Sequence, residues 1–274
     1  MPEGDTVWRV AGQLRTALVG SPLTVCDIRV PRFATVDLTP GPVEEVVSRG
    51  KHLLIRVGDD TVHTHLKMEG DWHVYPAGGR WRRPAWLARI LLGTDDFLAV
   101  GFQLGIVEVL ARDEEERAIG HLGPDLLGPD WDPDRAATNL AAEADRPIGL
   151  ALLDQRVLAG IGNVYRNELC FLRGVHPATP VAAAGEPHAW ADLAHRLLVA
   201  NRDRPVRITT GDRRRGRTTW VYGRPGRPCL RCGTLVEAGT LADGTPESER
   251  QIFWCPRCQV GPPGAAPRHG RGGP

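Results

Sequence analysis

Lysine is the scarcest charged residue of this 274-residue chain: of its 34 Lys and Arg residues, only Lys51 and Lys67 are lysines. A GC-rich coding sequence produces such a bias wherever a surface position needs only a positive charge. A compact ammonium and a planar guanidinium are not interchangeable, however. The two surviving lysines therefore indicate positions at which an ammonium is required.

Long apolar runs are absent as well. No run reaches the roughly 18 residues that a membrane-spanning helix needs, and residues 1–5 have neither the basic nor the apolar stretch of a secretory signal. We therefore expect a cytoplasmic protein that does not enter a membrane. In that reducing compartment, paired cysteines indicate metal binding rather than disulfides.

A strong net charge is also missing, since the formal value is only +1. The overall balance argues neither for nor against a nucleic-acid partner. The distribution is uneven, because residues 202–231 hold ten arginines and two acids, and the rest of the chain is net acidic. A local basic segment, more than the global charge, indicates where an anionic partner binds.

The hydrophobic pattern changes along the chain. Residues 3–19 have apolar positions at helical spacing, acids in the first turn and Gly20 as a stop, which predicts an amphipathic helix. From residue 24 to about residue 110 there are short runs rich in Val, Ile, Leu and Thr, separated by Gly, Pro and Asp. These runs predict an antiparallel β-sandwich or barrel, with the clearest strands at 53–57, 61–66, 72–75, 89–92 and 107–110.

The second half is first helical and then irregular. Prolines at 124, 129 and 133 indicate a linker, after which the pattern predicts helices at 136–144, 148–158, 164–172 and 190–201. Residues 202–228 are basic and rich in Gly and Pro, which indicates loop with short strands. Residues 234–240 and 251–254 predict a β-hairpin, and residues 261–274 a disordered tail.

Four of the six cysteines form two Cys-x-x-Cys pairs. A structural Zn²⁺ prefers a tetrahedral set of sulfurs, and the chain offers Cys229, Cys232, Cys255 and Cys258. We therefore expect one zinc ion per chain; the alternative, two redox pairs, lacks the usual βαβ context. Cys26 and Cys170 lie in apolar surroundings, which predicts buried, inert thiols.

Aromatic and basic residues flank these pairs. Arg250 precedes the second pair by five residues, and Tyr222, Arg224 and Arg227 lead into the first. Guanidinium groups suit phosphate, so we expect this region to contact DNA. A solvated basic face is the alternative.

The segment 158–168 contains two glycines, Gly160 and Gly162, just before a predicted helix that starts near Asn163. A helix N-terminus offers free N–H groups and a positive dipole end, so it is able to hold a phosphate. A glycine-containing turn between packed helices is the commoner explanation. No strand precedes the segment, which argues against a dinucleotide-binding fold.

Proline follows the initiator methionine, so removal of Met1 would give Pro2 a secondary amine. An α-amine titrates near pH 8 and is partly unprotonated in the cell. It is then able to attack carbon and form an iminium, with Glu3 as a proton donor or acceptor. Many proteins, however, carry proline at this position for no catalytic reason.

Two histidines, His63 and His65, lie at i and i+2 and therefore on one face of a predicted strand. They permit a second hypothesis, a metal hydrolase. No third ligand has a convincing spacing, so a satisfied structural pair is favoured.

Six separated motifs occur together in one order: residues 2–4 (Pro-Glu-Gly), 50–54 (Gly-Lys-His-Leu-Leu), 65–70 (His-Leu-Lys-Met-Glu-Gly), 160–163 (Gly-Ile-Gly-Asn), 222–224 (Tyr-Gly-Arg) and the two Cys-x-x-Cys pairs. That order resembles the formamidopyrimidine-DNA glycosylase / endonuclease VIII family over residues 2 to about 259. Residues 2–8 look like the endonuclease VIII branch found in actinobacteria.

The resemblance implies an α+β multidomain fold with DNA between the domains. It implies an N-terminal antiparallel β-sandwich with an N-terminal helix (1–120), a helix–two-turn–helix domain (121–215) and a β-hairpin zinc finger (216–260), followed by the tail (261–274). It implies a bifunctional glycosylase and abasic-site lyase of base excision repair. Its partner would be damaged duplex DNA, with single-stranded or bubble DNA left open, and the protein would be a monomer associated with the nucleoid.

The resemblance also implies roles for individual residues. Pro2 attacks C1′ of the damaged nucleotide, Glu3 protonates the sugar or the leaving base, and Lys51 stabilises charge near the sugar and its phosphate. Asn163 and Arg250 clamp the phosphates beside the flipped nucleotide. A base must leave the stack before its glycosidic bond is reached, and Met68 is the candidate wedge for the vacated space, with Lys67 beside it. Plain core filler is the alternative for Met68.

Three departures from the family pattern bear on the substrate. Thr6 stands where a second Glu is frequent, residues 102–105 lack an Arg-Arg-Phe-Gly-like turn, and segment 209–220 is short where the guanine-oxidation branch has a capping loop. Together they favour oxidised pyrimidines or ring-opened purines. The rival hypothesis is a non-catalytic zinc-finger DNA-binding paralogue. The role of residues 213–215 stays open between phosphate contact, partner surface and solubility.

Overall fold

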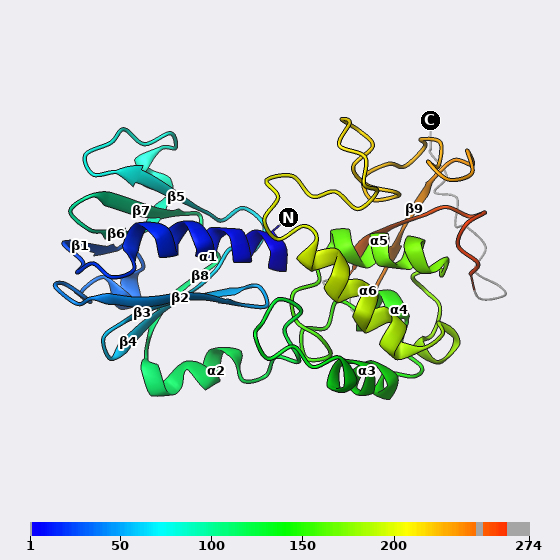
Figure 1. The fold of residues 1–274 in the computed structure, drawn as a ribbon, viewed down its shortest axis with the longest axis horizontal. Helices are drawn as coiled ribbons and strands as arrows, with labels where there is room; N and C mark the ends of the chain where they lie inside the picture. Colours follow the sequence, from blue (N-terminus) through cyan, green and yellow to red (C-terminus); the bar gives the residue numbers. More distant parts are fainter. Residues whose placement is uncertain (1, 245–248, 262–274) are drawn as a thin grey trace.

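The computed structural model describes residues 2–244 and 249–261. The chain forms two halves that lie side by side, one built of β-sheets and the other mainly of helices (Figure 1). The N-terminal helix lies within the first half and points its start at the second. Among the described residues, no helix is both long and apolar enough to cross a membrane.

The first half is a sandwich of two four-stranded antiparallel sheets, as the sequence predicts. One sheet has the order β2-β3-β4-β8, formed by Val43–Arg49, His52–Val57, Asp60–His65 and Ile106–Ala111. The other has the order β1-β6-β7-β5, formed by Val25–Ile28, Ala88–Gly93, Phe97–Phe102 and Asp71–Pro76. Strands β1, β2 and β7 lie inside the predicted β region, although their patterns are weaker.

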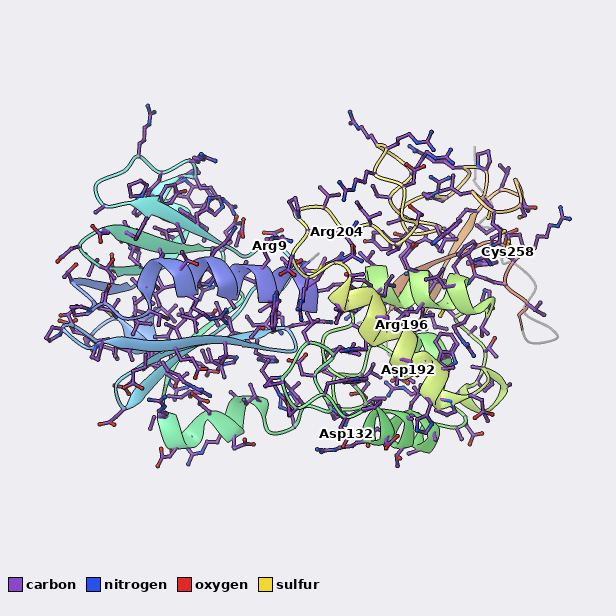
Figure 2. The ribbon with its side chains drawn as sticks, in the orientation of Figure 1. Arg9, Asp132, Asp192, Arg196, Arg204 and Cys258 are labelled. Carbon is purple, nitrogen blue, oxygen red and sulfur yellow. The ribbon has the colours of Figure 1, made fainter. Side chains whose placement is uncertain are left out.

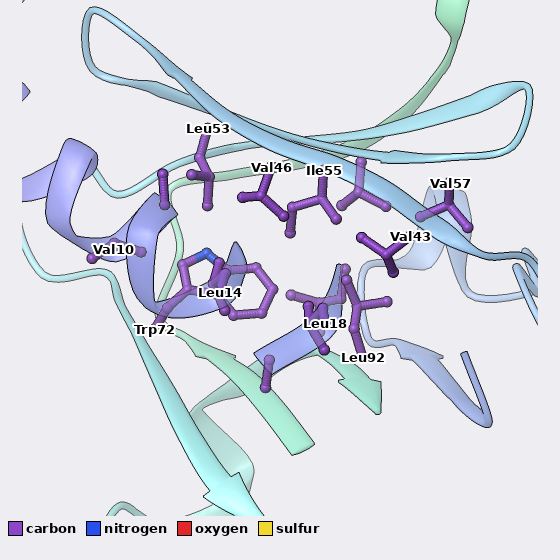
Figure 3. Close-up of a cluster of buried hydrophobic side chains, with 14 of the residues drawn as sticks. Val10, Leu14, Leu18, Val43, Val46, Leu53, Ile55, Val57, Trp72 and Leu92 are labelled. Atoms are coloured by element: carbon purple, nitrogen blue, oxygen red, sulfur yellow. The ribbon is translucent and has the colours of Figure 1, made fainter. Parts of the chain in front are cut away.

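Helix α1 (Gly4–Leu18) packs between the two sheets (Figure 3). Its apolar stripe, which includes Val10, Leu14 and Leu18, contacts Val46 on one sheet and Trp72 on the other. Burying one stripe of a helix against both sheets fixes its direction. The N-terminus of α1, and with it Pro2 and Glu3, is therefore held at the edge of the sandwich that faces the second half.

The second half contains four helices in the described chain: α3 (Pro133–Ala142), α4 (Ile148–Ala151), α5 (Asn163–Arg173) and α6 (Pro187–Val199). The short helix α2 (Glu115–Ile119) lies beside the sandwich instead (Figure 1), where Glu115 pairs with Arg56 of β3. Residues 2–244 and 249–261 also contain four single turns of 3₁₀ helix, at Pro31–Phe33, Ala85–Leu87, Arg112–Glu114 and Val181–Ala183. Trp190 and Tyr165 are the largest side chains of the helical core and are almost fully buried.

The predicted helix 148–158 is wrong beyond residue 151. Helix α4 ends there because Asp154 organises a turn instead: its carboxylate accepts the N–H of Arg156 at 3.0 Å and pairs with the guanidinium groups of Arg146 and Arg156. Asp side chains compete in this way with helical hydrogen bonds. The remaining residues up to Gly160 form turns rather than helix.

A β-hairpin closes the described chain, with β9 at Glu237–Leu241 and β10 at Arg250–Trp254. It packs on α5 through a small third core that includes Phe171, Val221 and Phe253. The hairpin prediction is confirmed, with strand ends shifted by a few residues. The predicted tail lies, except for Gly261, outside the described residues.

Candidate functional site

A cavity of about 600 Å³ opens where the two halves meet. Its wall consists of Pro2, Lys51, His65, Lys67, Met68, Leu153, Gln155, Gly162, Asn163 and Arg250. Six of the predicted site residues thus line one cavity: Pro2, Lys51, Lys67, Met68, Asn163 and Arg250. They come from the residues before α1, two turns of the sandwich, the start of α5 and strand β10. The fold therefore brings residues that are far apart in the sequence to one cavity.

Glu3 joins the two halves directly beneath Pro2. Its fully buried carboxylate accepts the backbone N–H groups of Gly162, Val164 and Tyr165 at 2.8, 2.7 and 3.2 Å, at the start of α5. A carboxylate at a helix N-terminus satisfies orphan donors and is stabilised by the helix dipole. A β-carbon on residue 162 would lie 2.5 Å from the Glu3 side chain, so only glycine permits this approach.

The phosphate site predicted at this helix start needs correction. Three of the N–H groups expected to be free for an external anion already bind the protein's own Glu3. A phosphate contact by the Asn163 side chain stays a prediction. That side chain donates to the carbonyl oxygen of Gln251 at 3.1 Å and lines the cavity.

A buried charged cluster surrounds Glu3. The Arg207 guanidinium donates two hydrogen bonds to the Asp5 carboxylate, one of them from Nε at 2.8 Å. Its Nη1 atom lies 3.9 Å from the Glu3 carboxylate. The Tyr165 hydroxyl donates to the same Asp5 carboxylate at 2.8 Å, and the guanidinium lies over the Tyr165 ring. The cluster fixes the first turn of α1 against α5 and the segment after α6.

Lys51 lies on the turn between β2 and β3. Gly50 adopts φ of +57° there and donates its N–H to the buried carboxylate of Asp125 at 2.9 Å, which ties the turn to the second half. Burial lowers the pKa of Lys51 to about 8, although nearby Glu3 favours the charged form. A lysine with such a pKa is able to act as a cation or, once deprotonated, as a base near neutral pH.

The turn 66–70 brings Met68 to the cavity. Lys67 has φ of +54°, and its N–H donates to His65 Nδ1 at 2.9 Å. A β-carbon on residue 105 would overlap the Lys67 side chain, so Gly105 is needed for this packing. Met68 is 63% exposed, and the interpretation of Met68 as core filler is therefore wrong.

Histidines of β3 and β4 form a chain of side-chain contacts that ends at Glu108. His63 contacts Glu108 through Nδ1 at 2.6 Å and His52 through Nε2 at 2.8 Å. The favoured interpretation, a satisfied structural pair, fits His63. His65 instead lines the cavity between the two halves. In the part of the chain that the structure describes, the four cysteines are the only group of three or more possible metal ligands, and neither His63 nor His65 belongs to it.

Arg250, the first residue of β10, is exposed at the cavity. Helix α5 sets its position: Arg166 donates to the carbonyl of Gln251 at 2.9 Å, and the Asn167 side chain accepts the N–H of Phe253 at 2.8 Å. The same helix that is capped by Glu3 therefore aligns the strand that carries Arg250.

Tyr222 and Arg224 both make contacts within the protein. Arg224 is 6% exposed, and its guanidinium donates to the carbonyl oxygens of Gly216 and Pro228, so it braces the loop rather than presenting itself to a phosphate. The half-buried ring of Tyr222 packs edge-on against Phe253 at 5.3 Å. Direct DNA contact by either residue stays a prediction, and their packing favours a supporting role.

The four paired cysteines come together as expected, with all sulfurs within 4.8 Å of one another. Two of the separations are 3.5 Å (Cys232 to Cys255) and 4.0 Å (Cys229 to Cys258). Tetrahedral Zn–S bonds of about 2.3 Å place sulfurs roughly 3.8 Å apart. The donor set and its spacing therefore fit a tetrahedral metal ion.

The two other cysteines have no comparable arrangement. Cys170 is fully buried, and burial raises the pKa of its thiol to about 12. Cys26 is half-buried, and burial raises the pKa of its thiol as well. Both stay mainly protonated at neutral pH, as expected of inert thiols.

Sequence reasoning missed three residues of the cavity wall: His65 as a contact, Leu153 and Gln155. Gln155 accepts the N–H of Gly160 at 3.0 Å and donates to Leu153 and Ile161, so it shapes the glycine turn. No local pattern points to Gln155 or Leu153. His65 could have been found from its place beside Lys67 and Met68 in one motif.

The comparisons with known proteins agree with this geometry. The model of the formamidopyrimidine-DNA glycosylase N-terminal domain matches residues 1–158, and that of the formamidopyrimidine-DNA glycosylase H2TH domain matches residues 122–197. The chain belongs to the formamidopyrimidine-DNA glycosylase / endonuclease VIII family. The predicted family and fold are thereby confirmed, and a role in DNA repair agrees with this membership.

Among its relatives is a probable endonuclease 8 2 of Streptomyces coelicolor, 57% identical over 98% of this chain and 97% of the relative. Another is the DNA-(apurinic or apyrimidinic site) lyase Nei2 of Mycolicibacterium smegmatis, 53% identical over 95% and 99%. A solved structure of MutM in complex with DNA that contains carbocyclic 8-oxo-G is similar in fold, with a TM-score of 0.77 and 22% identity over 94% and 100%.

Proposed function

We propose that this protein is a DNA glycosylase and abasic-site lyase whose nucleophile is the amine of Pro2, freed by removal of Met1. The convergence of Pro2, Lys51 and Arg250 on one cavity, above the Glu3 cap, is the observation that carries the proposal. The names of the relatives support the same reaction class.

The proposed reaction has two stages, loss of the base and cleavage of the strand. The unprotonated amine attacks C1′ of a flipped nucleotide, the bond from C1′ to the base breaks, and the base leaves with a proton. Glu3 supplies a proton to the sugar or to the base. The C1′–O4′ bond then breaks, O4′ takes up a proton, and the nitrogen lone pair forms an iminium between Pro2 and C1′. The iminium acidifies C2′, loss of a C2′ proton expels the 3′-phosphate, and the strand is cut by β-elimination, with δ-elimination as a further step.

The remaining residues hold the DNA. Lys51 places a cation near the reacting sugar and its phosphate, and Asn163 and Arg250 bind the flanking phosphates. Met68, exposed at the rim, fills the space of the extruded nucleotide. Zinc on the four cysteines would supply no chemistry to the reaction, only a rigid hairpin for Arg250.

Oxidised pyrimidines are the proposed substrates. The support is what this chain lacks: Thr6 in place of a second carboxylate, Gln103 in the β7–β8 turn and a short segment 209–220. Ring-opened purines are the second choice. The enzyme would act as a monomer on damaged duplex DNA.

Borohydride trapping on a duplex with an abasic site tests the mechanism. Wild type should give a covalent band that maps to the peptide beginning at Pro2, Pro2→Gly a band at least tenfold weaker, and Lys51→Ala an intermediate yield. A variant with one residue retained before Pro2 should bind DNA but not react. If it cleaved abasic DNA at the normal rate, the proline mechanism would be wrong. No band from wild type with DNA binding intact would instead support the non-catalytic paralogue.

A further inference from the structure

Strand β5 forms one edge of its sheet. Within the described residues, β7 is the only strand that pairs with it, because the sheet has the order β1-β6-β7-β5. Helix α1 runs beside β5 (Figure 1), and a groove of about 890 Å³ lies between the two. All six residues of β5 line this groove, from both faces of the strand. The free backbone edge of β5 therefore faces the groove.

The register of the sheet shows which backbone groups of β5 point away from β7. Phe97, the first residue of β7, accepts the N–H of Thr94 at 2.9 Å and so bonds toward β6. Alternate residues of an antiparallel strand bond to opposite neighbours, so β7 bonds to positions 71, 73 and 75 of β5. Trp72, Val74 and Pro76 therefore turn their backbone groups to the free edge, where a proline without an N–H is tolerated.

Part of this edge is already bonded. The N–H of Trp72 donates to the Asp71 side chain at 2.9 Å, and the carbonyl of Pro76 accepts the N–H of Gly79 at 2.9 Å. The carbonyl of Trp72 and the N–H and carbonyl of Val74 are left for a ligand. One donor between two acceptors is the pattern that an extended peptide backbone complements, whereas a phosphodiester backbone has no donor for the two carbonyls.

The groove also carries positive charge. Arg9, Arg80 and Arg82 line it, and Asp71 supplies the one carboxylate among its lining residues. Arg9 marks the end at which the two halves meet, since its guanidinium donates to the carbonyl oxygen of Arg204 at 2.6 Å (Figure 2). A second copy of this chain, paired through the same edge, would bring like charges together. An acidic partner gains from these charges instead.

The walls of the groove are built to hold a short extended segment. Six residues of strand span about 20 Å, and the part of α1 that lines the groove, from Thr6 to Ala17, spans about 17 Å. The Tyr75 hydroxyl accepts the N–H of Arg82 at 3.2 Å, which fixes the loop that carries the exposed arginines to β5. An extended segment of about six residues therefore matches the groove in length.

We propose that the free edge of β5 binds an extended acidic segment of a partner protein as an added β-strand, bonded to the backbone of Trp72 and Val74, with its carboxylates on Arg80 and Arg82. None of these four residues lines the cavity between the two halves. The partner would hold this protein while the cavity stays open to DNA. The inference goes beyond the proposed function and does not rest on it.

The test measures binding of a fluorescent hexapeptide of alternating Glu and Val to the full-length protein by anisotropy. A second peptide has the same sequence and charges, but every backbone nitrogen is methylated, so it has no N–H to donate. It should bind at least tenfold more weakly, because its hydrogen bonds to the two carbonyls are lost. The amide of Val74 should exchange its hydrogen at least tenfold more slowly when the unmethylated peptide is bound.

Two variants separate the charges from the edge. Arg80→Gln/Arg82→Gln should weaken binding about fivefold, because exposed ion pairs are individually weak. Val74→Pro should weaken it at least tenfold, since it removes the N–H that faces the groove. If Val74→Pro does not fold, the methylated peptide still decides. The matched control, Arg32→Gln/Arg117→Gln, removes two exposed arginines outside the groove and should bind as wild type does.

Four results would overturn the inference. Equal affinity for the methylated peptide would show that charge alone binds, and no binding below about 1 mM would show that the edge takes no such segment. A hexamer of thymidylate that displaces the peptide at a lower concentration than unlabelled peptide does would assign the groove to nucleic acid. A dimer in sedimentation that Val74→Pro dissociates would assign the edge to a second copy.

Discussion

Lys51 illustrates how one residue couples stability to function. Burial lowers the pKa of its ammonium to about 8, so the cation is present below pH 8 and is lost above it. Affinity for an uncleavable abasic duplex should therefore fall about tenfold between pH 7 and 9.5, the loss of one charge-assisted phosphate contact. Lys51→Arg should remove this fall, because a guanidinium stays charged. Anisotropy titrations across that range check it.

The N-terminal amine also titrates near pH 8, and Lys51→Arg leaves that amine unchanged. An equal decline of affinity in the variant would therefore assign the pH dependence to Pro2 and contradict a phosphate contact by Lys51.

The buried ammonium of Lys51 should also lower the stability of the folded protein. A lysine whose pKa in the folded protein lies below its ordinary value of 10.5 opposes folding fully below pH 8, and the penalty vanishes as the pH rises to 10.5. Lys51→Met should raise the Tm by roughly 2 °C or more at pH 7, and the gain should shrink above pH 8. Lys67→Met, at an exposed position of the same cavity, is the control and should leave the Tm unchanged. A lower Tm for Lys51→Met would contradict the burial argument.

At the scale of elements, hydrophobic spacing predicted those helices and strands whose formation depends on residues close in the sequence. Helix α1 and strands β3 to β5 follow from their hydrophobic spacing. The helix 148–158 failed because the Asp154 turn depends on Arg146, a partner outside the periodic segment. The Glu3 cap on α5 was equally hidden, since 159 residues separate Glu3 from Gly162. The sequence shows that no neighbouring side chain caps the N–H groups at the start of α5. It does not show that a distant carboxylate binds them.

Helix α5 holds segment 209–222 through one carboxylate. Glu168 is fully buried and accepts the N–H groups of Trp220, Val221 and Tyr222 at 2.7, 3.0 and 2.9 Å, together with the Thr209 hydroxyl. Glu168→Ala leaves these buried donors without an acceptor. At roughly 2–4 kcal/mol, the loss should lower the Tm by about 5 °C or more and expose the loop to trypsin at its arginines.

Glu186→Ala, which removes an exposed acid at the start of α6, is the matched control for Glu168→Ala. It should leave both the Tm and the tryptic pattern as in wild type. A Glu168→Ala protein that melts within 1 °C of wild type would show that the loop is held by other contacts.

For the whole molecule, the order of motifs predicted more than any single motif did. Proline at position 2, two lysines and Arg250 each have ordinary explanations, and only their common order pointed to one site. The cavity then unites them. The domain boundaries stay predictions. The Asp5–Arg207 pair, separated by 202 positions, could not have been inferred, because no spacing pattern connects the N-terminal motif to a residue so far along the chain.

Metal removal tests whether the position of Arg250 at the cavity depends on the four-cysteine site. The four sulfurs hold the two ends of the hairpin segment together, and β10 carries Arg250 to a cavity whose other walls belong to the sandwich and to α5. Without the metal, the small core of the hairpin has little apolar area to keep Arg250 in place. Cys232→Ser or chelation should therefore weaken binding to an abasic duplex at least tenfold, while the nucleophile itself is untouched.

Metal content by mass spectrometry should be one zinc per chain in wild type and in the control Cys26→Ser, whose half-buried thiol packs against the sandwich core. It should be near zero in Cys232→Ser. Borohydride trapping of the zinc-free protein at saturating DNA should still yield the Pro2 adduct, because α1, Glu3 and α5 form their contacts without the hairpin. If the adduct vanished even at saturation, the hairpin would be part of the reacting centre rather than its DNA clamp.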